Sequence, residues 1–171
     1  MSKLFIKAAR VSLFALCLPG VAMVSDAQAA KVRWQCVTFA RSFSGIEIRG
    51  NAHTWWEQSA GRYYRSSRPE VGAVLVLKSF GTGGMRLGHV ATISEVLSNR
   101  EVLITHANWT GRGEVDINVR AVDVSESGDW SRVKVWHTPI NALGRTAYPA
   151  FGFIHPKYEG QNAKTVRDAL K

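Results

Sequence analysis

The sequence predicts an α+β domain in which helices come first and a mostly antiparallel β-sheet follows. Two patterns support this prediction. Apolar residues recur at helical spacing between residues 36 and 60, whereas from residue 71 onward they alternate with polar residues or form the short dense runs typical of strands. The chain of 171 residues shows no internal repeat, so one folded domain is expected over residues 30–157.

The first 29 residues have the features of an export signal. Basic side chains precede an apolar run over residues 11–18, and Ala27-Gln28-Ala29 supplies the small residues of a cleavage site. We therefore predict a signal peptide over residues 1–29 and a mature protein that is secreted or periplasmic.

A retained membrane anchor and a lipoprotein signal are the alternatives for the same segment. Pro19-Gly20 breaks the apolar run, which is too short to span a bilayer, so no stable membrane span is expected in the mature protein. Leu16 rather than a small residue precedes Cys17, which disfavours a lipoprotein.

Two short helices are predicted after the signal. Val37, Ala40 and Phe43 lie on one side of a helix that begins at or beside Cys36. Asn51 is a candidate N-cap for the second helix, in which apolar and small residues recur every three or four positions, at Ala52, Trp55, Trp56, Ser59 and Ala60.

The second half of the chain predicts a sheet. A glycine-rich loop is expected over residues 80–84, a hairpin turn over residues 98–100 and a polar C-terminal tail over residues 158–171. Strands are predicted over residues 71–78, 89–97, 101–109, 115–122, 131–137 and 151–154.

The chain is strongly basic, with a formal net charge of +9 at pH 7. Nucleic acid is one class of partner for such a chain, but export argues against it. The anionic cell envelope, with its lipid head groups and the carboxylates of peptidoglycan, is the better match for an exported basic protein. We expect the protein to act as a monomer.

Cys36 is the first candidate for chemistry. The chain has two cysteines, and Cys17 lies in the predicted signal, so the mature protein keeps one thiol without a disulfide partner. A thiol at the start of a helix is in a position that favours the thiolate, which is the nucleophilic form.

Five histidines compete for the role of general base, and each has a structural role as its default interpretation. His89 is favoured because it follows Gly88 and opens a predicted strand. Asn108 lies on the next antiparallel strand, where it can accept a hydrogen bond from the imidazole and fix its tautomer. His106 lies two residues before Asn108, so both side chains are expected on one face of the sheet.

Several short motifs occur in order along the chain, namely Gln35-Cys36-Val37, Gly50-Asn51-Ala52 with Trp55, Pro69-Glu70-Val71-Gly72-Ala73-Val74, Gly88-His89-Val90-Ala91, Asn108-Trp109 and Gly152-Phe153-Ile154-His155. From residue 34 to residue 156 this series resembles the CHAP family, the cysteine, histidine-dependent amidohydrolases/peptidases. The resemblance implies a papain-like α+β fold and cleavage of amide bonds in peptidoglycan. The enzyme would be an N-acetylmuramoyl-L-alanine amidase or an endopeptidase of the peptide cross-links.

The resemblance also implies roles for single residues. Cys36 would be the nucleophile, His89 the general base and acid, and Asn108 the residue that orients His89, with no metal cofactor. The backbone N–H of Cys36 is expected to donate to the oxyanion, and Gln35 is a candidate second donor. No substrate-binding residue can be assigned.

One position departs from the family pattern. Many members carry an acidic residue two positions before the asparagine, where this chain has His106. A neutral histidine supplies no negative charge to stabilise an imidazolium at His89, and a protonated one would oppose it. The departure puts the pH optimum and the rate in doubt, and His106 is a candidate second titrating group.

Two other classes of function stay open. Cys36, His89 and His106 are potential zinc ligands, although they lack the short paired spacing of most zinc sites. A non-catalytic protein that keeps the fold and binds the cell envelope is the second alternative, because His106 replaces the acidic residue and no wall-targeting module is recognisable.

Overall fold

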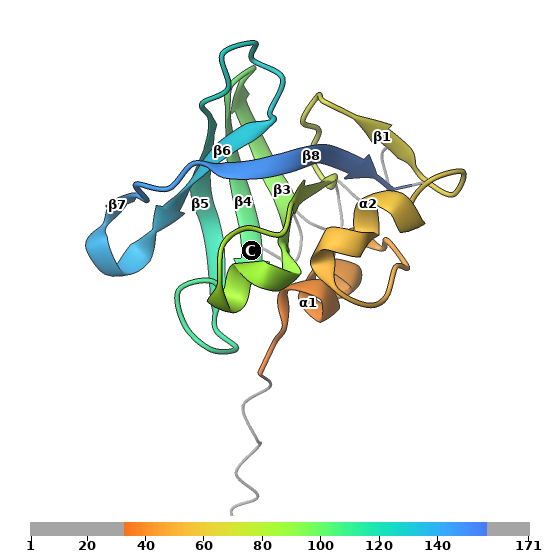
Figure 1. The fold of residues 1–171 in the computed structure, drawn as a ribbon, viewed down its shortest axis with the longest axis horizontal. Coiled ribbons are helices and arrows are strands. Elements are labelled where there is room, and N and C mark those ends of the chain that lie inside the picture. Colours follow the sequence, from red (N-terminus) through yellow and green to blue (C-terminus); the bar gives the residue numbers. More distant parts are fainter. Residues whose placement is uncertain (1–32, 157–171) are drawn as a thin grey trace, which may run out of the picture. The chain divides into compact units, whose positions relative to one another are not determined.

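The computed structural model describes residues 33–156 (Figure 1), so the predicted signal peptide and the predicted C-terminal tail lie outside the described residues. The helical segments are α1 (Cys36–Ser44), η1 (Ala52–Thr54), α2 (Trp55–Gln58), η2 (Gly83–Leu87) and η3 (Thr138–Ile140), where η marks a 3-10 helix. The strands are β1 (Tyr64–Ser66), β2 (Val74–Leu77), β3 (His89–Ser98), β4 (Glu101–Ala107), β5 (Val115–Asp123), β6 (Arg132–His137), β7 (Ala142–Leu143) and β8 (Tyr148–His155).

Helix α1 begins at Cys36, as the spacing of its apolar residues predicts. Gln35 is the N-cap residue, and its backbone N–H donates to the Thr38 hydroxyl at 3.2 Å, which satisfies one of the donors at the start of the helix. The helix ends at Gly45, whose φ of 73° is the left-handed conformation that glycine adopts at little cost. The position of Cys36 is therefore fixed by a defined helix start.

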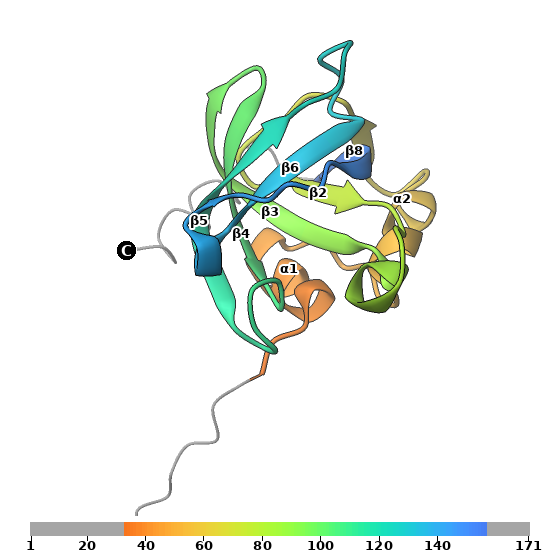
Figure 2. The same ribbon diagram turned by 60° about the vertical axis from the view of Figure 1, so that its left-hand side comes forward.

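The eight strands form one antiparallel sheet in the order β1-β8-β2-β3-β4-β5-β6-β7. Strand β8 also pairs with β6, and this pairing closes β8, β2, β3, β4, β5 and β6 into a barrel. Figures 1 and 2 show β8 lying across the barrel against β6. The prediction of helices followed by a mostly antiparallel sheet is confirmed, whereas the closure of the barrel was not predicted.

Strand β2 separates two apolar cores because its successive side chains point to opposite faces of the sheet. Leu75 and Leu77 belong to the core inside the barrel, together with Phe153 of β8. Val74 and Val76 face the other way and pack in a second core with residues of α1 and α2. All four residues of β2 are buried for this reason, which explains a dense apolar run in place of simple alternation.

The differences from the predicted elements concern their ends and the shortest strands. The predicted second helix is a turn of 3-10 helix followed by one turn of α-helix, and the predicted loop over residues 80–84 leads into η2. The three-residue strand β1 and the two-residue strand β7 were not predicted. Strand β4 ends at Ala107, so Asn108 and Trp109 lie beyond it.

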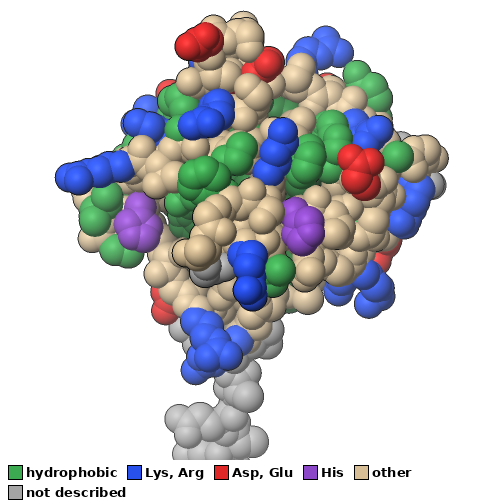
Figure 3. Space-filling model, viewed as in Figure 1, with side chains coloured by type: hydrophobic (Ala, Val, Ile, Leu, Met, Phe, Trp, Pro, Cys, Tyr) green, Lys and Arg blue, Asp and Glu red, His purple; other side chains and the backbone are tan. Residues whose placement is uncertain are grey.

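Basic side chains are spread over the face shown in Figure 3, with few acidic side chains among them and no single basic patch. The positive charge therefore favours anionic surroundings in general without marking one docking surface on this face. Among the helices of the described residues, none has the length and hydropathy needed to cross a membrane.

Candidate active site

A cavity of about 750 Å³ opens at the end of the barrel where β3 begins and β2 and β6 end. Its walls come from the start of α1, the segment around η1, the η2 segment, the turn after β4, and the β6–β7 connection. Cys36, His89 and Asn108, the three residues predicted for catalysis, all line it. The structure therefore brings these three residues, which span 72 positions of the sequence, to the wall of a single cavity.

Cys36 is a free, half-buried thiol at the first position of α1. Burial raises the pKa of this thiol, while the backbone N–H groups of Val90, Val37 and Cys36 itself act in the opposite direction. The donors expected at a helix start are thus present, but desolvation outweighs them. The expectation of a resting thiolate is wrong for this geometry, because the sequence does not reveal how deeply the sulfur is buried.

His89 opens β3 and is held there by a close backbone approach at Gly88. Gly88 has φ 72° and ψ −171°, a conformation open essentially to glycine alone. A Cβ at this position would lie 2.7 Å from the Leu77 carbonyl oxygen and 2.8 Å from the His53 backbone nitrogen. Gly88 therefore permits a close backbone approach beside His89 that a larger residue would block.

The hydrogen-bond partner of His89 is His106, not Asn108. Nε2 of His89 lies 2.9 Å from Nδ1 of His106, and both side chains are buried. This bond leaves Nδ1 as the ring nitrogen of His89 that His106 does not engage. The role predicted for Asn108, to orient the imidazole of His89, is filled in the structure by His106.

The end of β4 explains why Asn108 does not reach His89. Strands β3 and β4 pair Thr92 with Thr105, and continuing this register by three residues would place Asn108 opposite His89. Asn108 instead has φ 62°, a left-handed conformation that ends the strand and turns the side chain out of the alternating pattern. His106, which is still within β4, keeps its place on the face of the sheet that carries His89.

Asn108 contacts Gln35 instead. Its Oδ1 accepts the Gly113 backbone N–H at 2.9 Å, and its Nδ2 donates to Oε1 of Gln35 at 3.2 Å. The Gly113 N–H identifies which end of the Asn108 amide is the oxygen, so the Nδ2 of Asn108 faces Gln35. The oxygen of Gln35 accepts this bond, which leaves the Nε2 of Gln35 as a free donor beside the cavity. The Asn108 amide thus holds the Gln35 side chain in a defined orientation at the cavity wall.

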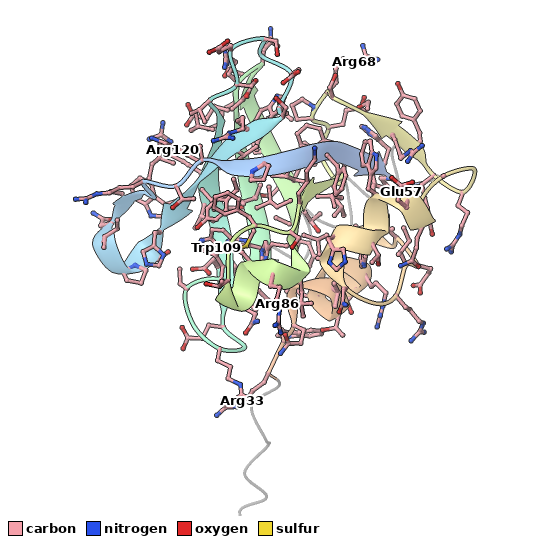
Figure 4. All side chains as sticks on the ribbon, in the orientation of Figure 1. Arg33, Glu57, Arg68, Arg86, Trp109 and Arg120 are labelled. Atoms are coloured by element: carbon pink, nitrogen blue, oxygen red, sulfur yellow. The ribbon has the colours of Figure 1, made fainter. Side chains whose placement is uncertain are left out.

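Trp109 covers the two imidazoles from the side. Its ring centroid lies 4.8 Å from that of His89, 5.5 Å from that of His106 and 5.2 Å from that of Tyr148 on β8. In Figure 4 Trp109 lies next to the η2 segment, which carries Arg86. Trp109 and residues of η2 both line the cavity. The indole of Trp109 therefore covers one side of both imidazoles.

Both imidazoles are neutral at physiological pH. Burial, reinforced by the neighbouring His106, lowers the pKa of His89 well below 6.5, whereas Asp116 acts in the opposite direction. Burial lowers the pKa of His106 to about 3. The cavity is therefore lined by a neutral thiol, Cys36, and a neutral imidazole, His89, a pair of groups suited to general-base activation of the thiol.

Asp116 is a site residue that the sequence did not mark. It lies on β5 directly opposite His106 on β4, and its Oδ2 is 3.9 Å from Nε2 of His106. No local motif surrounds it, and only the pairing of β4 with β5 brings it to the histidines.

The zinc alternative has no matching geometry within residues 33–156. No group of three or more His, Cys, Asp or Glu side chains in this range is arranged to hold a metal ion. The nitrogens of His89 and His106 point at each other at hydrogen-bond distance rather than at a shared position.

The chain is similar to one family model and to solved structures. No curated protein matches the sequence. Among solved structures, an N-acetylmuramoyl-L-alanine amidase from Staphylococcus aureus is similar with a TM-score of 0.46 and 19% sequence identity, over 68% of this chain and 30% of that one. This chain therefore spans less than a third of the length of that amidase.

The family model of the CHAP domain matches residues 26–108. The match includes Cys36, His89 and Asn108 and leaves out the strands from β5 onward. Residues 26–108 therefore match the CHAP domain, the family that the sequence resembles.

Proposed function

We propose that the protein is a peptidoglycan hydrolase that cleaves an amide bond with Cys36 as nucleophile and His89 as general base and acid. One observation carries the proposal. A free thiol at a helix start and a buried, neutral imidazole line the same cavity, and the far nitrogen of that imidazole is already engaged by His106. This arrangement is typical of nucleophilic acyl transfer.

The first step transfers the Cys36 proton to Nδ1 of His89 as the sulfur attacks the scissile carbonyl carbon. The carbonyl π electrons move to its oxygen and give a tetrahedral oxyanion, while His89 becomes an imidazolium. Because the resting pair is neutral, the proton moves during the attack rather than before it. The backbone donors around the sulfur then stabilise the charge that develops.

Two donors serve the oxyanion in this proposal. The backbone N–H of Cys36 lies at the start of α1, where helix N–H groups have no partner within the helix. The side-chain Nε2 of Gln35 is the second, oriented through Asn108. Loss of one donor of this kind typically raises the barrier by about 3 kcal/mol. Because Asn108 orients the Gln35 amide, Asn108 contributes to oxyanion stabilisation through Gln35.

The second half of the reaction reverses the proton transfer. The imidazolium of His89 protonates the leaving amine as the carbon–nitrogen bond breaks, which leaves a thioester on Cys36. His89 then takes a proton from water as the water oxygen attacks the thioester carbonyl. The tetrahedral intermediate collapses with cleavage of the carbon–sulfur bond, the carboxylic acid leaves, and the imidazolium of His89 returns its proton to the Cys36 sulfur.

The cavity suits an anionic peptide. Its lining contains Arg145, and none of the residues that line it is an aspartate or glutamate. Stem peptides of peptidoglycan carry free carboxylates, which a basic cavity in a chain of net charge +9 attracts. We propose cleavage at or within the stem peptide, as an amidase or an endopeptidase, by a monomeric catalytic domain over residues 30–157 of a secreted or periplasmic protein.

Digestion of purified peptidoglycan tests the proposal. The chain from residue 30 onward is incubated with peptidoglycan beside Cys36→Ala and Cys36→Ser, and soluble products are identified by mass spectrometry. Fragments from the unchanged protein alone are the expected result, and their masses distinguish amidase from endopeptidase cleavage. Equal fragments from all three proteins would remove Cys36 as the nucleophile.

A non-catalytic envelope-binding protein is the second candidate. The raised pKa of Cys36 favours it, since a resting thiol is a weaker nucleophile than a thiolate. Cosedimentation with peptidoglycan without soluble products, between pH 5 and 9 with reductant present, would support this candidate against the hydrolase.

A further inference from the structure

The far side of His106 faces a carboxylate. Asp116 is the cross-strand partner of His106, and its Oδ2 lies 3.9 Å from Nε2 of His106. His106 is 1% exposed and Asp116 is 8% exposed, so little solvent screens the pair. Among the residues that the structure describes, none makes a hydrogen bond to Nε2 of His106.

The carboxylate is held in place from two sides. The Thr110 hydroxyl lies 2.8 Å from both oxygens of Asp116, and the Thr138 hydroxyl donates to Oδ1 at 3.1 Å. Thr110 follows β4 and Thr138 follows β6, so the site is assembled from three parts of the barrel. Asp116 is not among the residues that line the cavity, which places it behind the histidines rather than beside the substrate.

The two neutral imidazoles share one proton along their hydrogen bond, so the tautomer of one determines that of the other. If Nε2 of His106 carries the proton, its Nδ1 is an acceptor and Nε2 of His89 must donate to it. Nδ1 of His89 then carries a lone pair and can accept a proton. In the opposite tautomer His89 would carry its proton on Nδ1 and could not act as a base.

We propose that Asp116 is a positioning residue that acts through His106: its carboxylate keeps the proton of His106 on Nε2 and thereby keeps Nδ1 of His89 free to accept the Cys36 proton. A lone pair on Nε2 of His106 would face the carboxylate and be repelled by it, whereas an N–H is attracted. The distance exceeds that of a hydrogen bond, so the selection is electrostatic. The negative charge that an acidic residue at position 106 would place beside His89 thus comes from Asp116, on the far side of His106.

This inference rests on the proposed function for its catalytic consequence, but the tautomer can be measured without any substrate. The experiment compares the unchanged protein with Asp116→Asn and with Asp123→Asn. Asp123 is the matched control because it is a buried, hydrogen-bonded carboxylate on the same strand and pairs with Arg100 rather than with a histidine. Long-range ¹H–¹⁵N correlation spectra assign the protonated nitrogen of each imidazole.

The unchanged protein and Asp123→Asn are expected to carry protons on Nε2 of both His106 and His89. Asp116→Asn is expected to populate the opposite pair of tautomers and to slow alkylation of Cys36 by iodoacetamide. With peptidoglycan fragments as substrate, kcat should fall at least about tenfold with KM within about twofold. That loss is smaller than the roughly 10⁴-fold loss seen when a carboxylate bonded directly to a catalytic histidine becomes an amide.

A proton on Nδ1 of His106 in the unchanged protein would overturn the proposal even if Asp116→Asn fails to fold. Identical tautomers in the unchanged protein and in Asp116→Asn would also overturn it. Absence of peptidoglycan cleavage together with the expected change of tautomer would instead contradict the proposed function and still support the positioning role of Asp116. Failure of the proposed function and failure of this inference are therefore distinguishable.

Discussion

Nε2 of His89 and Nδ1 of His106 face each other at 2.9 Å in the interior of the site. An acidic residue at position 106 would hold His89 by a charged hydrogen bond, whereas a histidine holds it by a neutral one. The site therefore keeps the geometry of an oriented base while moving the negative charge outward to Asp116. This arrangement favours a neutral resting pair of thiol and imidazole.

Gln35 and Asn108 are expected to act as one unit. Asn108→Ala removes the bond that orients the Gln35 amide, and Gln35→Ala removes the proposed oxyanion donor. Gln35→Ala should lower kcat by roughly 100- to 1,000-fold and Asn108→Ala by less, and the double variant should lose little more than Gln35→Ala alone. Steady-state kinetics on soluble peptidoglycan fragments, analysed as a double-mutant cycle, measures the coupling. Strictly additive losses would separate the two residues.

The helix start and the strand start that carry the proposed nucleophile and base were predictable, because both have local causes. Apolar spacing marks α1 from Cys36, and Gly88 marks the tight approach before β3. The family resemblance is confirmed on the same residues. Local signals of this kind are read directly from spacing and residue type.

What could not be predicted depends on contacts between distant parts of the chain. The β6–β8 pairing that closes the barrel leaves no local pattern in either strand. The left-handed conformation of Asn108 shortens β4 by two residues relative to its predicted end, and this change gives the orienting role to His106. The raised pKa of Cys36 follows from burial, which only the packed fold determines.

Gly88→Ala is expected to destabilise the fold through steric overlap as well as backbone strain. The added Cβ would lie 2.7 Å from the Leu77 carbonyl oxygen, and backbone atoms cannot move aside as a flexible side chain can. Gly61→Ala is the control, because Gly61 has φ 68° and a Cβ added there would meet no other atom within 4 Å. We expect a loss of about 1 kcal/mol in the free energy of unfolding for Gly61→Ala and of at least about 3 kcal/mol for Gly88→Ala. Urea denaturation measures both, and equal losses would contradict the steric argument.

Stability should fall as the pH is lowered below about 6.5. The pKa of His106 is about 3 in the folded protein and near 6.5 when the chain is unfolded, so between these values the unfolded state binds the extra proton. The contribution is fully present above 6.5 and is lost by up to about 1.4 kcal/mol per pH unit as the pH falls toward 3.

His106→Asn removes one of the two buried histidines with a lowered pKa, the other being His89, and should make the dependence of unfolding free energy on pH between 6.5 and 5 less steep without abolishing it. His53→Asn controls for the loss of a histidine, because His53 is only half-buried and lies on η1. Urea denaturation at several pH values provides the measurement. Parallel curves for the unchanged protein and His106→Asn would show that His106 is not the group responsible.

Arg145 is expected to select substrates by charge. It is exposed at the rim of the cavity, in a lining without acidic side chains, so its guanidinium is placed to meet a carboxylate of the stem peptide. Arg145→Gln should raise KM about two- to fivefold for fragments with a free carboxylate, with kcat little changed, because exposed charge pairs contribute up to about 1 kcal/mol. Arg132→Gln, an exposed arginine on β6 outside the cavity, is the control. Amidated fragments should bind the unchanged protein and Arg145→Gln equally, and a similar rise in KM for amidated and free-carboxylate fragments would show that Arg145 does not recognise the carboxylate.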